Sequence, residues 1–129
     1  MIWSVAIGGA IGSVARFALS GVIQRASGSG FPIWTLVINV TGSILLGFLM
    51  RYFVDGVPVA VEARAFLTAG FCGGYTTFST FSYETVALIE QGDWRRASMY
   101  VLASVTLSLA GVFAGIGLAR GVIAMQRGA

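Results

Sequence analysis

The chain has 129 residues, of which 57% are hydrophobic and 10% are charged, and its mean hydropathy is +0.86. This composition excludes an ordinary soluble domain and is typical of an integral membrane protein. The formal charge of +3 comes from scattered arginines, so nucleic-acid binding has no support. With one cysteine and no histidine, an intrachain disulfide, most metal sites and histidine-based triads are excluded, and we expect no enzyme.

Four apolar segments are long enough to cross a membrane as helices, which requires roughly 20 residues for a hydrocarbon core about 30 Å thick. Trp3, Trp34 and Trp94 each stand at the start of a segment, where an amphipathic ring prefers the headgroup level. The first segment lacks the basic stretch of a signal peptide, so we expect it to be retained. We therefore predict an all-α membrane protein with a single four-helix transmembrane domain, whose spans are about 2–24, 32–54, 62–91 and 96–123.

Arginines at the segment ends divide almost equally between the two sides of this predicted bundle. Four lie on the side of the N-terminus and three on the other, namely Arg51, Arg64, Arg120 and Arg127 against Arg25, Arg95 and Arg96. Because such charges orient membrane proteins, near-balance predicts insertion in both directions and an antiparallel, dual-topology homodimer. The alternative is that the small imbalance, or the first helix alone, imposes one orientation.

The third segment contains a run rich in glycine, hydroxyl and aromatic residues. Gly73 and Gly74 each lower helix stability by about 1 kcal/mol relative to alanine. Backbone that leaves a helix at membrane depth must be buried in protein or line a watery cavity. We therefore predict that the third helix breaks near residues 73–77, and that the break forms part of an ion permeation site.

Polar residues inside the second and fourth segments support this interpretation. Tyr100, Ser104 and Ser108 are four residues apart, so their hydroxyls lie on one helical face. Asn39, with Thr35 one turn before it, offers two N–H donors and one acceptor. The alternative for the serines is bonding within their own helix or to a neighbouring one, and for Asn39 it is holding helices in register.

Phe78 and Phe81 fall on one side of the helix that resumes after the break. Phenylalanines in membranes usually face lipid or fill the core, but these two alternate with the hydroxyls of Thr77 and Thr80. The positive edge of an aromatic ring attracts an anion without binding it tightly. We therefore expect both rings to line the passage.

Close helix packing is predicted by three pairs of glycines with the spacing that lets backbones approach in membranes. They are Gly8 with Gly12, Gly111 with Gly115, and Gly117 with Gly121. Because the chain has 18 glycines, some of these matches arise by chance.

The run 70–81 reads Gly-x-x-Gly-Gly-x-Thr-Thr-Phe-Ser-Thr-Phe, and it resembles the small fluoride channels called Fluc or CrcB. The resemblance extends to Gly8, Gly9, Gly12 and Arg16 in the first segment, to Thr35, Asn39 and Gly42 in the second, and to essentially the whole chain. Phe17 and Trp34 depart from the pattern, at positions that touch no predicted ion contact.

The resemblance implies a channel of the bacterial cytoplasmic membrane that lets fluoride leave the cell passively and so lowers fluoride toxicity. It implies an antiparallel homodimer with two pores and a central structural sodium ion on the main-chain carbonyls of Gly73 and Thr76. The implied fluoride pathway consists of Phe78, Phe81, Asn39, Tyr100, Ser104, Ser108, Thr77 and Thr80. Arg16 would raise the anion concentration at a vestibule, or else snorkel or bond helix-end carbonyls.

Two other functions fit the same size and helix count. A small dual-topology exporter driven by protons needs a titratable residue in its path, and Glu84 is the only carboxylate placed well within a span. A membrane scaffold without transport of its own needs no such residue.

Overall fold

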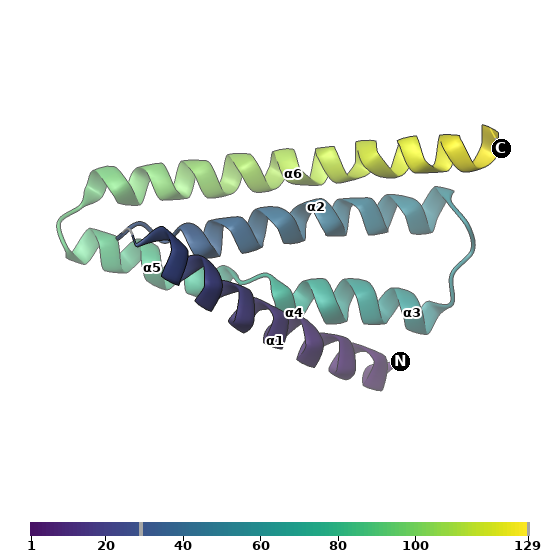
Figure 1. Ribbon diagram of the computed structural model, residues 1–129, viewed down its shortest axis with the longest axis horizontal. Coiled ribbons are helices and arrows are strands. Elements are labelled where there is room, and N and C mark those ends of the chain that lie inside the picture. The colour runs from purple at the N-terminus through teal and green to yellow at the C-terminus, as the bar shows by residue number, and fades with distance from the viewer. Residues whose placement is uncertain (29, 129) are drawn as a thin grey trace.

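The computed structural model describes residues 1–28 and 30–128, and this part of the chain is helical with no strand. The elements are α1 (Ile2–Ser27), α2 (Ile33–Asp55), α3 (Val61–Ala65), the π-helix η1 (Phe66–Cys72), α4 (Gly73–Tyr75), α5 (Phe78–Glu90) and α6 (Trp94–Gly128). The chain runs back and forth along one axis, so that both termini lie at the same end of the bundle (Figure 1).

Among the described residues, three helices are long and apolar enough to cross a membrane, namely α1, α2 and α6. The third expected span is not one helix. Its first half consists of α3, η1 and α4, which follow one another without a gap as far as Tyr75, and its second half is α5, which begins at Phe78. These elements lie in line beneath α2, while α1 crosses in front of them (Figure 1).

Glycines on one face of α6 allow its close packing against α2. Gly111 and Gly115 are buried, and a methyl group on Gly115 would lie 2.7 Å from the backbone nitrogen of Phe48. Gly117 and Gly121 face open space instead. Within the described part of this single chain, the first of the two glycine pairs in α6 brings helices together and the second does not.

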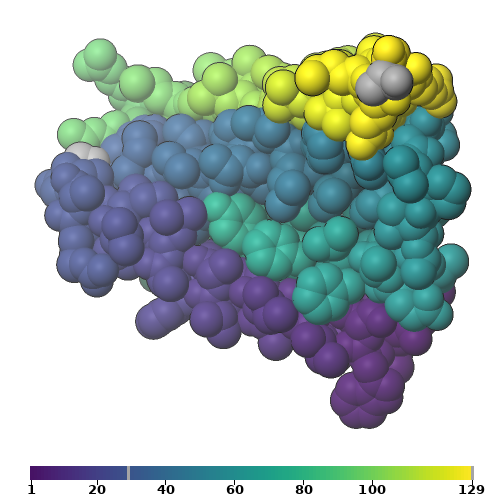
Figure 2. Space-filling view, turned by 45° about the vertical axis from the view of Figure 1, so that its right-hand side comes forward, coloured from purple at the N-terminus to yellow at the C-terminus, as the bar shows by residue number. Residues whose placement is uncertain are grey.

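A second close contact joins α1 to the segment that contains η1 and α4, as Figure 2 shows. Gly8 and Gly12 are buried against the carbonyls of Phe66 and Phe71. From the other side, a methyl group on Gly74 would lie 2.5 Å from the carbonyl oxygen of Gly9. The glycines thus form a backbone-to-backbone interface that fixes the break relative to α1.

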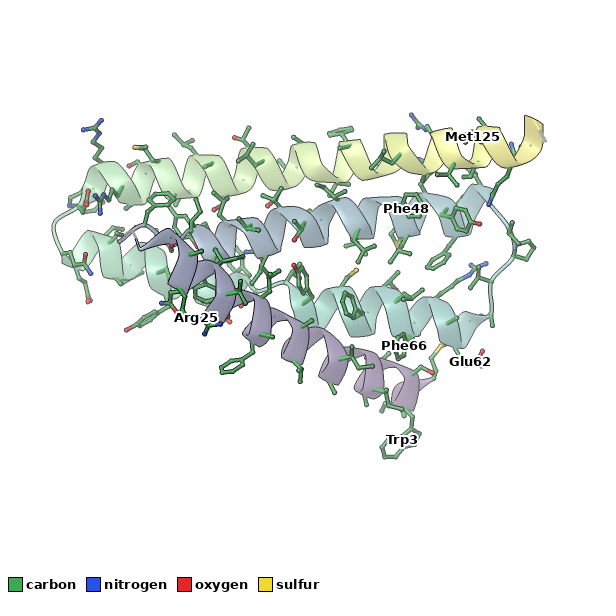
Figure 3. The ribbon with its side chains drawn as sticks, viewed as in Figure 1. Trp3, Arg25, Phe48, Glu62, Phe66 and Met125 are labelled. Atoms are coloured by element: carbon green, nitrogen blue, oxygen red, sulfur yellow. The ribbon has the colours of Figure 1, made fainter. Side chains whose placement is uncertain are left out.

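Large apolar side chains cover the outside of the bundle. Trp3 is 77% exposed and points away from the other helices near the N-terminal end (Figure 3). Such exposed side chains would be unfavourable in water, and they are what a protein surrounded by lipid presents.

We predict opposite effects for two matched substitutions in α6. Gly115→Ala should destabilise the protein by about 1–3 kcal/mol, because the added methyl meets the backbone of α2. Gly117→Ala has open space and should be neutral or stabilising by up to about 1 kcal/mol. Thermal unfolding in detergent measures both, and equal melting temperatures for the two variants would contradict the packing described.

Candidate functional site

The helix break lies at Thr76 and Thr77, whose backbones are extended, with φ, ψ of −84°, 159° and −151°, 116°. From the sequence we expected Gly73 and Gly74 to be part of the break. They belong to α4 instead, so the break begins after them. Thr76 ends α4 by donating from both its backbone N–H and its hydroxyl to the carbonyl of Cys72, at 3.0 and 2.9 Å. Gly74 serves instead for the close approach of α1.

After the break, α5 begins with Thr77 as its N-cap. The Thr77 hydroxyl accepts a hydrogen bond from the backbone N–H of Thr80 at 3.2 Å and donates to the Thr80 hydroxyl at 3.1 Å. This is the usual capping role of threonine, and it leaves the other first-turn N–H groups as the positive end of the helix dipole.

Asn39 of α2 holds the break through two hydrogen bonds to Thr77. Its Nδ2 donates to the Thr77 carbonyl at 3.0 Å, and its Oδ1 accepts from the Thr77 N–H at 2.8 Å. These bonds define the orientation of the amide, because the backbone N–H needs an acceptor and the carbonyl needs a donor. One N–H of Asn39 remains for another partner.

Arg16 of α1 lies at the C-terminal end of α4. Its Nε donates to the Gly74 carbonyl at 3.1 Å, and the Ser13 hydroxyl is 3.5 Å from the same oxygen. A cation at this position interacts favourably with the negative end of a helix. The bond between Arg16 and a helix-end carbonyl, which was one of its three expected roles, is present in the structure.

Two neighbouring carbonyls have no donor in the described part of the chain. The N–H of Thr77, which would reach Gly73 in a continuous helix, bonds Asn39. The N–H of Thr80, which would reach Thr76, bonds the Thr77 hydroxyl. The carbonyl oxygens of Gly73 and Thr76 therefore lack the donors that a continuous helix would supply.

Beside the break, between α2, α5 and α6, lies a cavity of about 280 Å³, whose surface is largely apolar. It is called here the polar groove for the hydroxyl and amide side chains in its lining. None of its described lining residues is charged; they are Asn39, Gly42, Ser43, Leu46, Thr76, Thr77, Phe78, Phe81, Ser104, Val105 and Ser108. The rings of Phe78 and Phe81 are 5.6 Å apart and tilted by 48°. The Ser104 side chain is buried, and its hydroxyl has no hydrogen-bond partner in the described structure.

Tyr100 does not line the polar groove and stands at its end. Its residue is 0% exposed, and its hydroxyl donates to Oε1 of Glu84 at 2.9 Å. The hydroxyl of Thr35 donates to the same oxygen at 2.6 Å. The Tyr100 ring also lies 5.1 Å from Phe81 and 5.5 Å from Phe31, measured between ring centroids.

The structure thus places six of the eight expected pathway residues around one cavity, whereas Thr80 and Tyr100 adjoin it. Sequence reasoning missed the cluster of Glu84 with Thr35 and Tyr100. The sequence relates Thr35 to Asn39 and not to Glu84, because the two partners of Glu84 lie on two other helices. It also missed Ser13, whose spacing of three residues from Arg16 on one helical face was the available signal.

A family described as "CrcB-like protein, Camphor Resistance (CrcB)" matches residues 3–116 of the chain. The protein named "Fluoride-specific ion channel FluC" in Geobacter sulfurreducens is 48% identical over 119 residues, covering 92% of this chain and 96% of that one. Its namesake in Nitrobacter winogradskyi is 47% identical over 92% of this chain and 94% of its own. The one in Methylococcus capsulatus is 48% identical over 92% of this chain, which spans only 52% of that longer protein.

These relatives are named as ion channels and not as enzymes, in agreement with the expectation of a non-enzymatic membrane protein. The family match covers most of the chain, including the broken third segment and the residues of the polar groove up to Ser108. This multi-pass membrane protein belongs to the CrcB family.

Proposed function

We propose that this chain is a fluoride-selective channel of the bacterial inner membrane, which lets fluoride leave the cell passively. The observation that carries the proposal is the buried, unpartnered hydroxyl of Ser104 in a groove whose described lining has no charged residue. Moving a small anion out of water costs tens of kcal/mol unless donors replace its hydration shell. The names of the relatives supply the identity of the anion.

The donors around the polar groove are suited to an ion that must also leave. Besides Ser104, they include the remaining N–H of Asn39 and the first N–H groups of α5, which begins beside the groove. The edges of Phe78 and Phe81 add a weak attraction. A fixed cation among these groups would trap the anion, whereas neutral donors bind weakly enough to allow conduction.

The functional unit that we propose is an antiparallel homodimer with two pores. Phe78 is 78% exposed although it lines the polar groove, so the groove is open on one side. A second copy related by a two-fold axis would close it with the same surface. The near-balance of arginines between the two ends supports insertion in both orientations.

We also propose a structural sodium ion at the axis of that dimer. The free carbonyls of Gly73 and Thr76 fit a hard cation, which prefers oxygen ligands, and a two-fold pair would present each of them twice. Bound there, the cation would neutralise the converging carbonyl dipoles. In each chain, Asn39 donates to the adjoining carbonyl of Thr77, and Arg16 donates to that of Gly74. These two oxygens are therefore not counted among the ligands of the proposed cation.

Purified protein in liposomes should release fluoride and retain chloride, as measured with ion-selective electrodes. Because the described lining of the polar groove has no titrating group, release should need no proton gradient. Protein-free liposomes are the control. Proton-driven export of organic cations that Glu84→Gln abolishes would support the exporter instead, and folded dimers without any flux would support a scaffold.

Ser104→Ala should lower fluoride flux by about threefold to tenfold, the effect of losing one hydrogen bond to the ion. Its stability should change little, because the hydroxyl has no protein partner to lose. The matched control is Ser98→Ala, an exposed serine of the same helix outside the polar groove. Equal flux of both variants, in dimers of normal stability, would contradict a role for Ser104.

Replacing sodium by a large organic cation should weaken the dimer or stop fluoride flux, because the carbonyls of Gly73 and Thr76 would then repel one another. Size-exclusion chromatography and liposome flux measure the two effects. No sodium current should accompany fluoride when sodium is present. A fluoride flux that moves with sodium and follows the sodium gradient would indicate cotransport and contradict a structural ion.

A further inference from the structure

A second cavity lies beyond the end of the polar groove, at the end of the bundle opposite the termini. This outer cavity has a volume of about 290 Å³, and its described lining residues are Gln24, Ser27, Gly30, Phe31, Pro32, Trp34, Glu84, Ala87, Leu88 and Gln91. Tyr100 stands between the two cavities, since its ring contacts Phe81 of the groove and Phe31 of the outer cavity. On the proposed function, the outer cavity is the mouth of the passage on this side of Tyr100.

The charge of this mouth is unfavourable for an anion. Glu84 is the one ionisable residue among its described lining residues. Two hydroxyls donate to its Oε1, and in its ionised form the carboxylate would repel an anion that enters this cavity. A cation at the rim would offset this repulsion, and its effect on entry would depend on salt.

Arg96 is placed to supply that cation. A methyl group built on Gly30, which lines the outer cavity, would lie 3.3 Å from Nη1 of Arg96. On its other side, Nε of Arg96 lies 3.5 Å from Oδ2 of Asp93, and the arginine side chain is 53% exposed. The guanidinium thus lies between Asp93 and Gly30, next to the outer cavity, although Arg96 is not itself one of the described lining residues.

The position of Arg96 is not explained by helix stability. It lies in the first turn of α6, which begins at Trp94 and has no acidic residue in that turn. A cation there opposes the positive end of the helix dipole. Asp93 offsets part of this cost by accepting a hydrogen bond from the Arg96 backbone N–H at 3.0 Å. A residue that is unfavourable for its own helix is expected mainly at positions that serve function.

We propose that Arg96 attracts the permeating anion to the outer cavity, and that Asp93 tempers this attraction. The inference rests on the proposed function, because it assigns Arg96 to the entry step of the same passage. It predicts that the contribution of Arg96 is electrostatic, so that charge and ionic strength determine it and the detailed shape of the side chain does not.

The test is the single-channel fluoride current in planar bilayers at a constant, low fluoride concentration. The current is measured in inert salt at about 0.1 M, where the Debye length is about 10 Å, and at about 1 M, where it is about 3 Å. Arg96→Gln should lower the current about threefold at low salt and hardly at all at high salt. Arg96→Lys should retain most of it. Asp93→Asn, which preserves the cap, should raise the current at low salt.

Arg95→Gln is the matched control, because Arg95 is the exposed neighbour and carries the same charge, whereas the side chain near Gly30 is that of Arg96. It should change the current clearly less than Arg96→Gln. Equal effects of the two variants, or a loss in Arg96→Gln that does not depend on salt, would overturn the inference. Absence of fluoride current in the unmodified protein would instead contradict the proposed function itself.

Discussion

The pair of hydrogen bonds between the Asn39 side chain and the Thr77 backbone is the interaction on which the site depends. Where a helix breaks in lipid, its N–H and C=O groups have no water to bond, and each would cost several kcal/mol. Asn39 satisfies both groups of Thr77, at 2.8 and 3.0 Å. Because one amide does this from a neighbouring helix, α5 can start anew and direct its positive end toward the polar groove.

Close packing by glycine makes the rest of the break possible. The glycines of α1 and α4 let two backbones touch, and this contact brings Arg16 within reach of the Gly74 carbonyl. The π-helical turns of η1 lead directly into this region, and such turns are frequent at functional sites. Side chains thus bond the carbonyls of Gly74 and Thr77, while those of Gly73 and Thr76 lose their helical donors and are the candidates for a cation.

Charged side chains lie near the polar groove but not in its described lining. The polar groove has neutral donors along its described lining, while Arg16 lies at the break and Glu84 and Arg96 lie at the outer cavity. This separation suits an anion that is costly to desolvate. Charges at the approaches change how often it enters, whereas neutral donors determine how long it stays.

Composition and segment length by themselves determined that this is an all-helical membrane protein, because lipid permits few other structures. Helical spacing likewise placed Ser104 and Ser108 on one face of α6. Only the tertiary structure decided that the break follows Tyr75, that the Tyr100 hydroxyl donates to Glu84, and that a methyl group on Gly117 would meet open space in this chain. The reason is that these outcomes depend on which helices meet: Asn39 and Thr77 are 38 residues apart, and no local pattern specifies their contact.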